Sequence, residues 1–175
     1  MILCVAVDDN MGMMFNRRRQ SQDKNLRKYL IALAGERKLW INSYTAGQFD
    51  TPLPPVIVSD DDFLKKAGAN ELCFVENQSL KTYAEKVSEV ILLKWNRVYP
   101  ADFYFDLPMP EAEWKLESTS EFGGNSHDKI TVEVWKRNQR RQNISFMSEK
   151  GIQESSLAVP AANIFLLKWQ EDLPE

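Results

Sequence analysis

Histidine and cysteine are scarce in this chain, and their scarcity excludes several classes of enzyme. The 175 residues include one histidine, His127, and two cysteines, Cys4 and Cys73. Zinc and two-metal sites use several such ligands, so the sequence predicts no metal site and no metal-dependent hydrolase or nuclease. Both cysteines lie inside apolar runs, which indicates buried free thiols and a reducing, cytoplasmic setting. His127 follows a Gly/Asn/Ser turn and is expected to be an exposed loop residue.

Other ligand-binding and targeting patterns are also missing. The seven glycines form no P-loop, and no Gly-x-Ser-x-Gly elbow presents a catalytic serine. No apolar run approaches the roughly 20 residues that cross a bilayer, and residues 1–7 lack the preceding positive region of a signal peptide. The net charge of -3 argues against a general nucleic-acid coat. The composition therefore predicts a soluble protein that does not contact membranes.

What the sequence does contain is an alternation of strand and helix patterns. Five apolar runs have the length and composition of buried strands; they are residues 2–7, 38–44, 56–58, 72–75 and 89–98. Three helices are expected between them, at about residues 21–35, 59–68 and 80–87. Ser21 is the expected N-cap of the first helix, with Asp23 in its first turn. This order predicts an α/β fold whose mostly parallel central sheet carries helices on both faces.

The pattern changes in the last part of the chain. Apolar and polar residues alternate over 114–119 and 130–135, with a Gly-Gly-Asn-Ser turn between them, which predicts an antiparallel hairpin. Residues 8–20 are expected to form a long loop. We place one domain over 1–138 and a C-terminal extension over 139–175. The extension is expected to pack on that domain or on the partner subunit of a homodimer.

A parallel α/β sheet that ends in an antiparallel hairpin is an uncommon order, and residues 1–138 resemble the dihydrofolate reductase family. The similarity is carried by residues 1–7, 10–13, 90–95, 103–106, 114–122 and 125–136. The resemblance implies a dihydrofolate reductase-like fold. It would also imply NADPH as a cofactor and Asp23 as the catalytic acid that holds the pterin ring, although Asp23 falls about one turn early.

The family's functional positions mostly differ in this chain. Where the family has a glycine pair against the cofactor pyrophosphate, this chain has Glu76-Asn77-Gln78, whose side chains would occupy the ligand's place and whose carboxylate would repel it. The family's cationic turn after the second strand is replaced by 42–45, a threonine by Leu93, and an apolar loop segment by 17–19. The groove positions that a cofactor would touch are Ser43, Thr45, Ser59, Glu76, Asn77 and Gln78. The sequence predicts that no cofactor binds there.

Two basic clusters suggest contacts with anions. Arg17, Arg18 and Arg19 are expected at the mouth of the cleft, where guanidinium groups would suit phosphate or carboxylate; a solvated loop is the simpler interpretation. The second cluster consists of Lys136, Arg137, Arg140 and Arg141. Its simpler interpretation is the charged end of a strand. If both lie on one face, a nucleotide or RNA backbone becomes a plausible partner.

Three hypotheses follow from the sequence. The first is a dihydrofolate reductase-like protein that lacks reductase activity and acts as a binding or interaction module, with an anionic small molecule or nucleotide as partner. The second is a divergent NADPH-dependent reductase of a pteridine-like substrate. The third is a nucleotide- or RNA-binding protein that uses the rim of residues 17–19.

Overall fold

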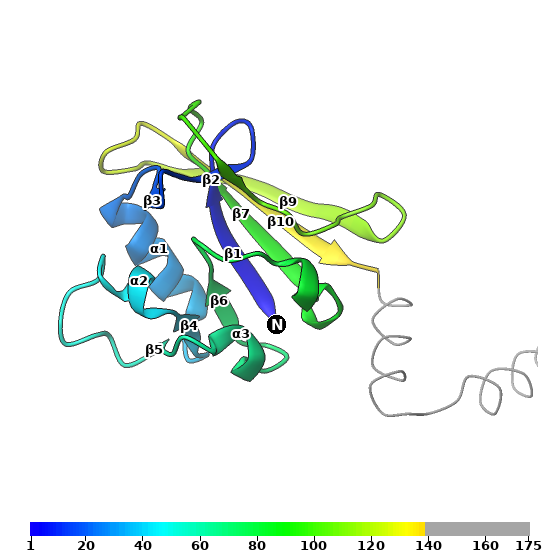
Figure 1. The fold of residues 1–175 in the computed structure, drawn as a ribbon, viewed down its shortest axis with the longest axis horizontal. Coiled ribbons are helices and arrows are strands. Elements are labelled where there is room, and N and C mark those ends of the chain that lie inside the picture. The colour runs from blue at the N-terminus through cyan, green and yellow to red at the C-terminus, as the bar shows by residue number, and fades with distance from the viewer. Residues whose placement is uncertain (139–175) are drawn as a thin grey trace, which may run out of the picture. The chain divides into compact units, whose positions relative to one another are not determined.

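The computed structural model describes residues 1–138, which build a seven-stranded mixed sheet with helices and loops on both faces (Figure 1). The strand order is β5-β4-β6-β1-β7-β10-β9. The strands are β1 (Ile2–Val7), β4 (Leu39–Ile41), β5 (Ile57–Ser59), β6 (Leu72–Phe74), β7 (Glu89–Lys94), β9 (Trp114–Phe122) and β10 (Ile130–Arg137). The first five in the spatial order are parallel, and β10 and β9 continue the sheet antiparallel. The predicted fold class is confirmed, including the C-terminal hairpin.

A small second sheet occupies the segment that was expected to be a long loop. It has the order β3-β2-β8, with β2 at Gly12–Phe15, β3 at Arg18–Arg19 and β8 at Phe103–Tyr104. The local pattern could not show it, because β2 pairs with β8 from far along the chain. The turn between β2 and β3 places Asn16 and Arg17 at positive φ values of 50° and 61°, a backbone region that few residues other than glycine adopt.

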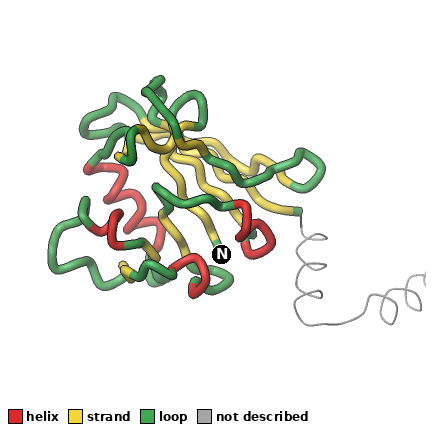
Figure 2. Tube along the Cα trace, in the orientation of Figure 1, coloured by secondary structure: helices red, strands yellow, loops and turns green. Residues whose placement is uncertain are grey.

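The helices are shorter than predicted. They are α1 (Lys24–Ala34), α2 (Ser43–Ala46), α3 (Phe63–Lys66) and a 3₁₀ helix, η1 (Lys81–Lys86); Figure 2 shows how much of the chain around the sheet is loop. Asp23, not Ser21, is the N-cap of α1. The strand predicted over 38–44 ends early because the Asn42 side chain accepts a hydrogen bond from the Thr45 amide and starts α2.

Two hydrophobic cores lie on opposite faces of the sheet, and β1 contributes to both. Successive strand residues point to opposite faces, so Ile2 and Cys4 pack in the core beneath α1, while Leu3, Val5 and Val7 pack in the core beneath α3 and η1. The apolar face of α1 supplies Leu26, Leu30 and Ala34 to the first core, as its spacing predicts.

The two cysteines are free and fully buried, as predicted. Burial raises the pKa of both thiols, so neither is poised to react. Among residues 1–138, no helix has the length and hydrophobicity needed to cross a bilayer. The predicted packing of 139–175, and the part of the second basic cluster beyond Arg137, lie outside the described residues. Within that cluster Lys136 pairs with Glu117, and the Arg137 guanidinium donates to the Ala84 carbonyl.

We expect Leu30→Ala to lower the free energy of unfolding by about 2–5 kcal/mol, because it leaves a cavity in the core beneath α1. Leu116→Ala is the matched control, since Leu116 lies on the edge strand and is 40% exposed; it should change stability by less than about 0.5 kcal/mol. Urea unfolding followed by tryptophan fluorescence measures both. Equal losses for the two variants would contradict this assignment of the core.

Candidate functional site

The side chain of Asp23 joins helix α1 to the turn of the β9–β10 hairpin. Its Oδ1 accepts hydrogen bonds from the Asn25 and Leu26 amides at 2.8 and 3.3 Å, as an N-cap residue does. The same carboxylate accepts the Asn125 and Ser126 amides from the hairpin turn, at 2.9 and 2.8 Å. Asp23 is thereby held rigidly at a point where two segments more than one hundred residues apart meet.

His127 lies against Asp23 and is 7% exposed, so the expectation of an exposed loop residue is wrong. Its Nδ1 is 3.1 Å from Asp23 Oδ2, and its Nε2 is 2.9 Å from the Tyr99 hydroxyl and 3.2 Å from Ser21 Oγ. The imidazole stacks on the Trp95 ring with centroids 4.4 Å apart. The turn folds back on α1 instead of projecting into solvent, and this buries the ring.

Glycine at position 124 is what allows the hairpin turn to come so close. A Cβ atom there would lie 2.4 Å from the His127 carbonyl oxygen and 2.8 Å from Asp23 Oδ2. The Gly-Gly-Asn-Ser pattern was interpreted as a simple hairpin turn. The sequence analysis therefore missed that His127 has a buried carboxylate partner. No local pattern shows this contact, because Asp23 lies 104 residues earlier in the chain.

The hydrogen bonds around Asp23 also set its protonation. Burial alone would raise the pKa of this carboxyl group. The donors on Asn125, Ser126, His127 and Asn25 outweigh that effect and hold the pKa of Asp23 well below its ordinary value of 3.8. Asp23 is therefore an anion throughout the neutral range and does not itself carry a proton that could be transferred.

The carboxyl ends of β4 and β6 carry a second polar cluster, centred on Glu76. Its carboxylate accepts hydrogen bonds from Arg19 Nε at 3.0 Å, Arg19 Nη2 at 3.2 Å and Thr45 Oγ1 at 2.8 Å. The Arg19 guanidinium also lies over the Tyr44 ring, 4.4 Å from its centroid. Glu76 is 8% exposed. Arg19, predicted as an anion-binding residue, therefore binds an anion of its own chain.

The other predicted site residues are spread along the same edge of the sheet. Asn77 accepts a hydrogen bond from the Asn42 side chain at 2.8 Å, and Gln78 lies half-buried beside it. The exposed Ser43 donates its amide to Asp61, and Ser59 is exposed at the end of β5. Arg17 lines a cavity of about 380 Å³ together with Met14, Asn77, Asp102 and Phe103. Arg18 is exposed on β3.

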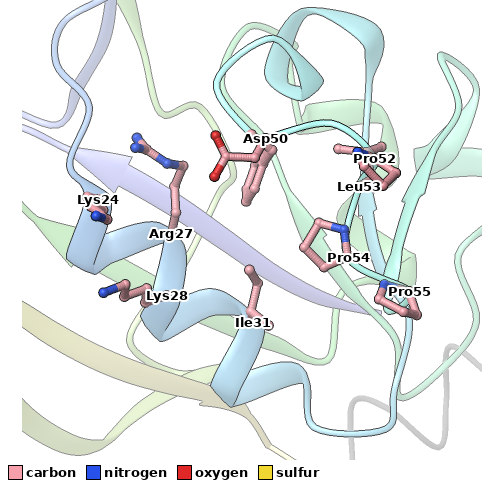
Figure 3. Close-up of a pocket in the computed structure, with 10 residues that line it drawn as sticks. Lys24, Arg27, Lys28, Ile31, Asp50, Pro52, Leu53, Pro54 and Pro55 are labelled. Carbon is pink, nitrogen blue, oxygen red and sulfur yellow. The ribbon is translucent and has the colours of Figure 1, made fainter.

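A larger groove runs between α1 and the loop that precedes β5 (Figure 3). Its volume is about 640 Å³. Lys24, Arg27 and Lys28 project from α1 on one side, and the residues of the loop from Asp50 to Pro55 lie opposite. The apolar contacts come from Ile31, Phe49, Pro52, Leu53, Pro54 and Pro55. Three cations against the one carboxylate of Asp50 leave the groove positively charged beside an apolar wall, which suits a ligand that combines an anionic group with a flat apolar body.

Within residues 1–138, no cluster of three or more His, Cys, Asp or Glu side chains is placed to hold a metal ion. The scarcity of histidine and cysteine is the physical reason in this part of the chain. Asp23 and His127 pair with each other and with neighbouring hydroxyls. Asp8 binds the backbone of its own loop and the Gln20 side chain.

The architecture defines the class of protein structure to which this chain belongs, the dihydrofolate reductase-like fold. One solved structure that shares it is a dihydrofolate reductase from Enterococcus faecalis complexed with NADP(H) and RAB-propyl. The two chains are 12% identical with a TM-score of 0.54, and the match covers 79% of this chain and 96% of that one. At this identity the likeness shows the fold alone. No protein-family model and no curated protein matches the sequence.

The position of Asp23 predicts a specific response to acid. Its pKa is lower in the folded than in the unfolded chain, so its stabilising effect is complete above the ordinary value of 3.8 and is lost as the pH falls toward the folded value. We expect Asp23→Asn to lower stability at pH 7 by about 1–3 kcal/mol, because one amide cannot replace the carboxylate's acceptor capacity. The variant should also flatten the loss of stability below pH 4. Chemical unfolding at a series of pH values measures both effects.

Asp9→Asn is the control, because Asp9 lies next to a buried aspartate but is itself exposed. It should keep the stability and the acid response of the parent protein. An Asp23→Asn variant with an unchanged acid profile would contradict the assigned role of this carboxylate.

Proposed function

We propose that this protein uses a dihydrofolate reductase-like fold to bind an anionic small molecule, without hydride transfer from NADPH. The observation that carries the proposal is the Glu76 cluster. Parallel α/β sheets bind ligands at the carboxyl ends of their strands, and a phosphate there needs a close backbone or a helix N-terminus. Here Glu76 and its partners Arg19 and Thr45 fill the position after β6 with side chains and a negative charge.

The course of the chain after β6 supports the same conclusion. Residues 76–78 form bends before η1, and η1 is a 3₁₀ helix of six residues. Such a segment offers neither the glycine-lined approach nor the aligned amides that a pyrophosphate uses. A dinucleotide would have to displace Arg19 from Glu76 and would then meet the exposed carboxylate.

The groove beside α1 is the site that we assign to the ligand. Lys24, Arg27 and Lys28 provide charge for a carboxylate or phosphate, while Ile31 and Leu53 provide an apolar contact for a ring. The groove lies on the α1 side of the molecule and does not require the Glu76 cluster to open. A binding module of this kind needs no cofactor.

Two alternatives remain as competing hypotheses. A divergent NADPH-dependent reductase is favoured by the fold and by the NADP(H) in the structure of the Enterococcus faecalis enzyme. It requires Glu76 to leave Arg19. A nucleotide- or RNA-binding protein would use the rim of residues 17–19, of which Arg19 is engaged with Glu76 and Arg17 and Arg18 are exposed. A salt-dependent affinity for RNA would support this alternative.

The test is calorimetric titration of the full chain with dihydrofolate, as a ring that carries carboxylates, and separately with NADPH. We expect dihydrofolate to bind and NADPH not to bind at millimolar concentration. The double variant Arg27→Glu, Lys28→Glu should weaken dihydrofolate binding at least about tenfold, since charged hydrogen bonds contribute ~1.5–3 kcal/mol each. Lys81→Glu, a charge reversal of an exposed lysine on η1, is the control and should leave binding unchanged.

Tight NADPH binding with dihydrofolate-dependent oxidation would replace this proposal with the reductase alternative. Binding of dihydrofolate that is insensitive to the double variant would move the ligand away from the α1 groove. No binding of dihydrofolate would exclude this ring-and-carboxylate class of ligand.

The Glu76 cluster can be tested by itself. Glu76→Ala removes the acceptor for three hydrogen bonds and leaves Arg19 and the buried Thr45 hydroxyl without this partner. We expect the free energy of unfolding to fall by about 1–3 kcal/mol. Glu121→Ala, which breaks the exposed pair with Lys129, is the control and should cost less than about 1 kcal/mol. Thermal or urea unfolding of the three proteins decides between a structural ion pair and a solvated one.

A further inference from the structure

Three side chains have the arrangement of a nucleophile, a base and a carboxylate that orients the base: Ser21, His127 and Asp23. Ser21 Oγ is 3.2 Å from His127 Nε2, and His127 Nδ1 is 3.1 Å from Asp23 Oδ2. Both separations lie within the reach at which a base activates a hydroxyl and a third group orients the base. Ser21 is half-buried, whereas its two partners are buried, so the hydroxyl is the most accessible member.

We propose that Ser21, His127 and Asp23 form a serine-nucleophile site that hydrolyses small carboxylic esters, an activity distinct from the binding function proposed above. The dihydrofolate reductase-like fold does not imply this chemistry. The sequence does not indicate it either, because it contains no Gly-x-Ser-x-Gly elbow. The triad is recognised by its geometry and by the role of each group.

The contacts around His127 hold its imidazole ring in one orientation and one tautomer. Four backbone amides hold the Asp23 carboxylate, and Asp23 in turn fixes Nδ1 of the imidazole as the protonated nitrogen. The Trp95 ring stacks on the imidazole and limits its rotation. Nε2 is therefore the acceptor nitrogen, and its single lone pair accepts a hydrogen bond from either the Ser21 or the Tyr99 hydroxyl at one time. Asp23 is a positioning residue, since it acts through His127.

The reaction follows from these contacts. The Ser21 oxygen attacks the ester carbonyl carbon while its proton passes to His127 Nε2. Protonated Nε2 no longer accepts from Tyr99, so the Tyr99 hydroxyl is free to donate a hydrogen bond to the tetrahedral oxyanion. The carbon–oxygen bond to the alcohol breaks, and the departing alkoxide takes the proton from Nε2. A water molecule then attacks the acyl-serine, gives its proton to Nε2, and releases the carboxylic acid as Ser21 recovers that proton.

A pocket beside His127, which Ser21 does not line, is where the part of an ester beyond the reacting carbonyl would extend. It has a volume of about 420 Å³ and is lined by Trp95, Asn96, Arg97, Ser126, His127, Asp128 and Lys129. Arg97 and Lys129 place two cations in this lining, against one carboxylate of Asp128. Esters with a negatively charged substituent are the class that this charge pattern favours.

The experiment uses the full-length protein, a serine-directed fluorophosphonate and 4-nitrophenyl acetate. We expect one covalent adduct, located on Ser21 by peptide mass spectrometry, and release of 4-nitrophenolate. Ser21→Ala should abolish both, and His127→Gln should slow labelling by ~10²–10⁴-fold. Ser118→Ala is the matched control, because Ser118 is an exposed serine of β9 that belongs neither to the triad nor to the pocket lining. It should keep the Ser21 adduct.

A positioning role for Asp23 is read from the pH profile of labelling. The groups that face His127 are Asp23 and Tyr99, and Arg97, Asp128 and Lys129 line the adjacent pocket. Asp23→Asn should shift the profile of the labelling rate, which loss of stability alone would not do at temperatures where the variant is folded. A protein that is folded by circular dichroism but forms no adduct, or whose adduct lies on another residue, overturns the proposal.

Discussion

The carboxylate of Asp23 is the contact on which the packing of the β9–β10 turn against α1 depends. It begins helix α1, accepts the amides of the β9–β10 turn and orients His127 in that turn, so two segments far apart in the sequence take their relative positions from one side chain. A buried carboxylate is costly without donors, and here the fold supplies four backbone amides, the imidazole of His127 and the Ser126 hydroxyl. The close approach at Gly124 is a consequence, because the turn must reach the carboxylate with its backbone.

The Glu76 cluster plays a comparable part on the other side of the α1 N-terminus. It joins the β2–β3 arm, through Arg19, to the ends of β4 and β6, through Thr45 and Glu76 itself. The strand ends of a parallel sheet expose amides and carbonyls that a ligand normally satisfies. In this chain the side chains of Arg19, Thr45 and Glu76 meet part of that requirement through hydrogen bonds to one another.

Much of the fold could be predicted from the sequence, and the exceptions have physical reasons. Buried parallel strands appear as continuous apolar runs, so β1, β6 and β7 were visible, and the alternation of β9 and β10 identified the hairpin. The small sheet was missed because its pairing partner β8 is remote in sequence. His127 was misplaced because turn composition reports backbone geometry and says nothing of what the turn packs against. Arg19 looked like a free cation because its partner is 57 residues away.

The central position of β1 has a consequence for how this chain reaches its structure. Ile2 pairs with Leu72 on one side and with Glu89 on the other, so β1 has both of its neighbours only after residues 72–94 have been synthesised. Loop closure over such separations is slow compared with the formation of a helix or hairpin. During synthesis the apolar stretch Ile2–Val7 therefore stays unpaired until β6 and β7 have been made. Until its neighbours are made, an apolar strand of this kind favours aggregation of the incomplete chain, whereas in the finished sheet it is buried.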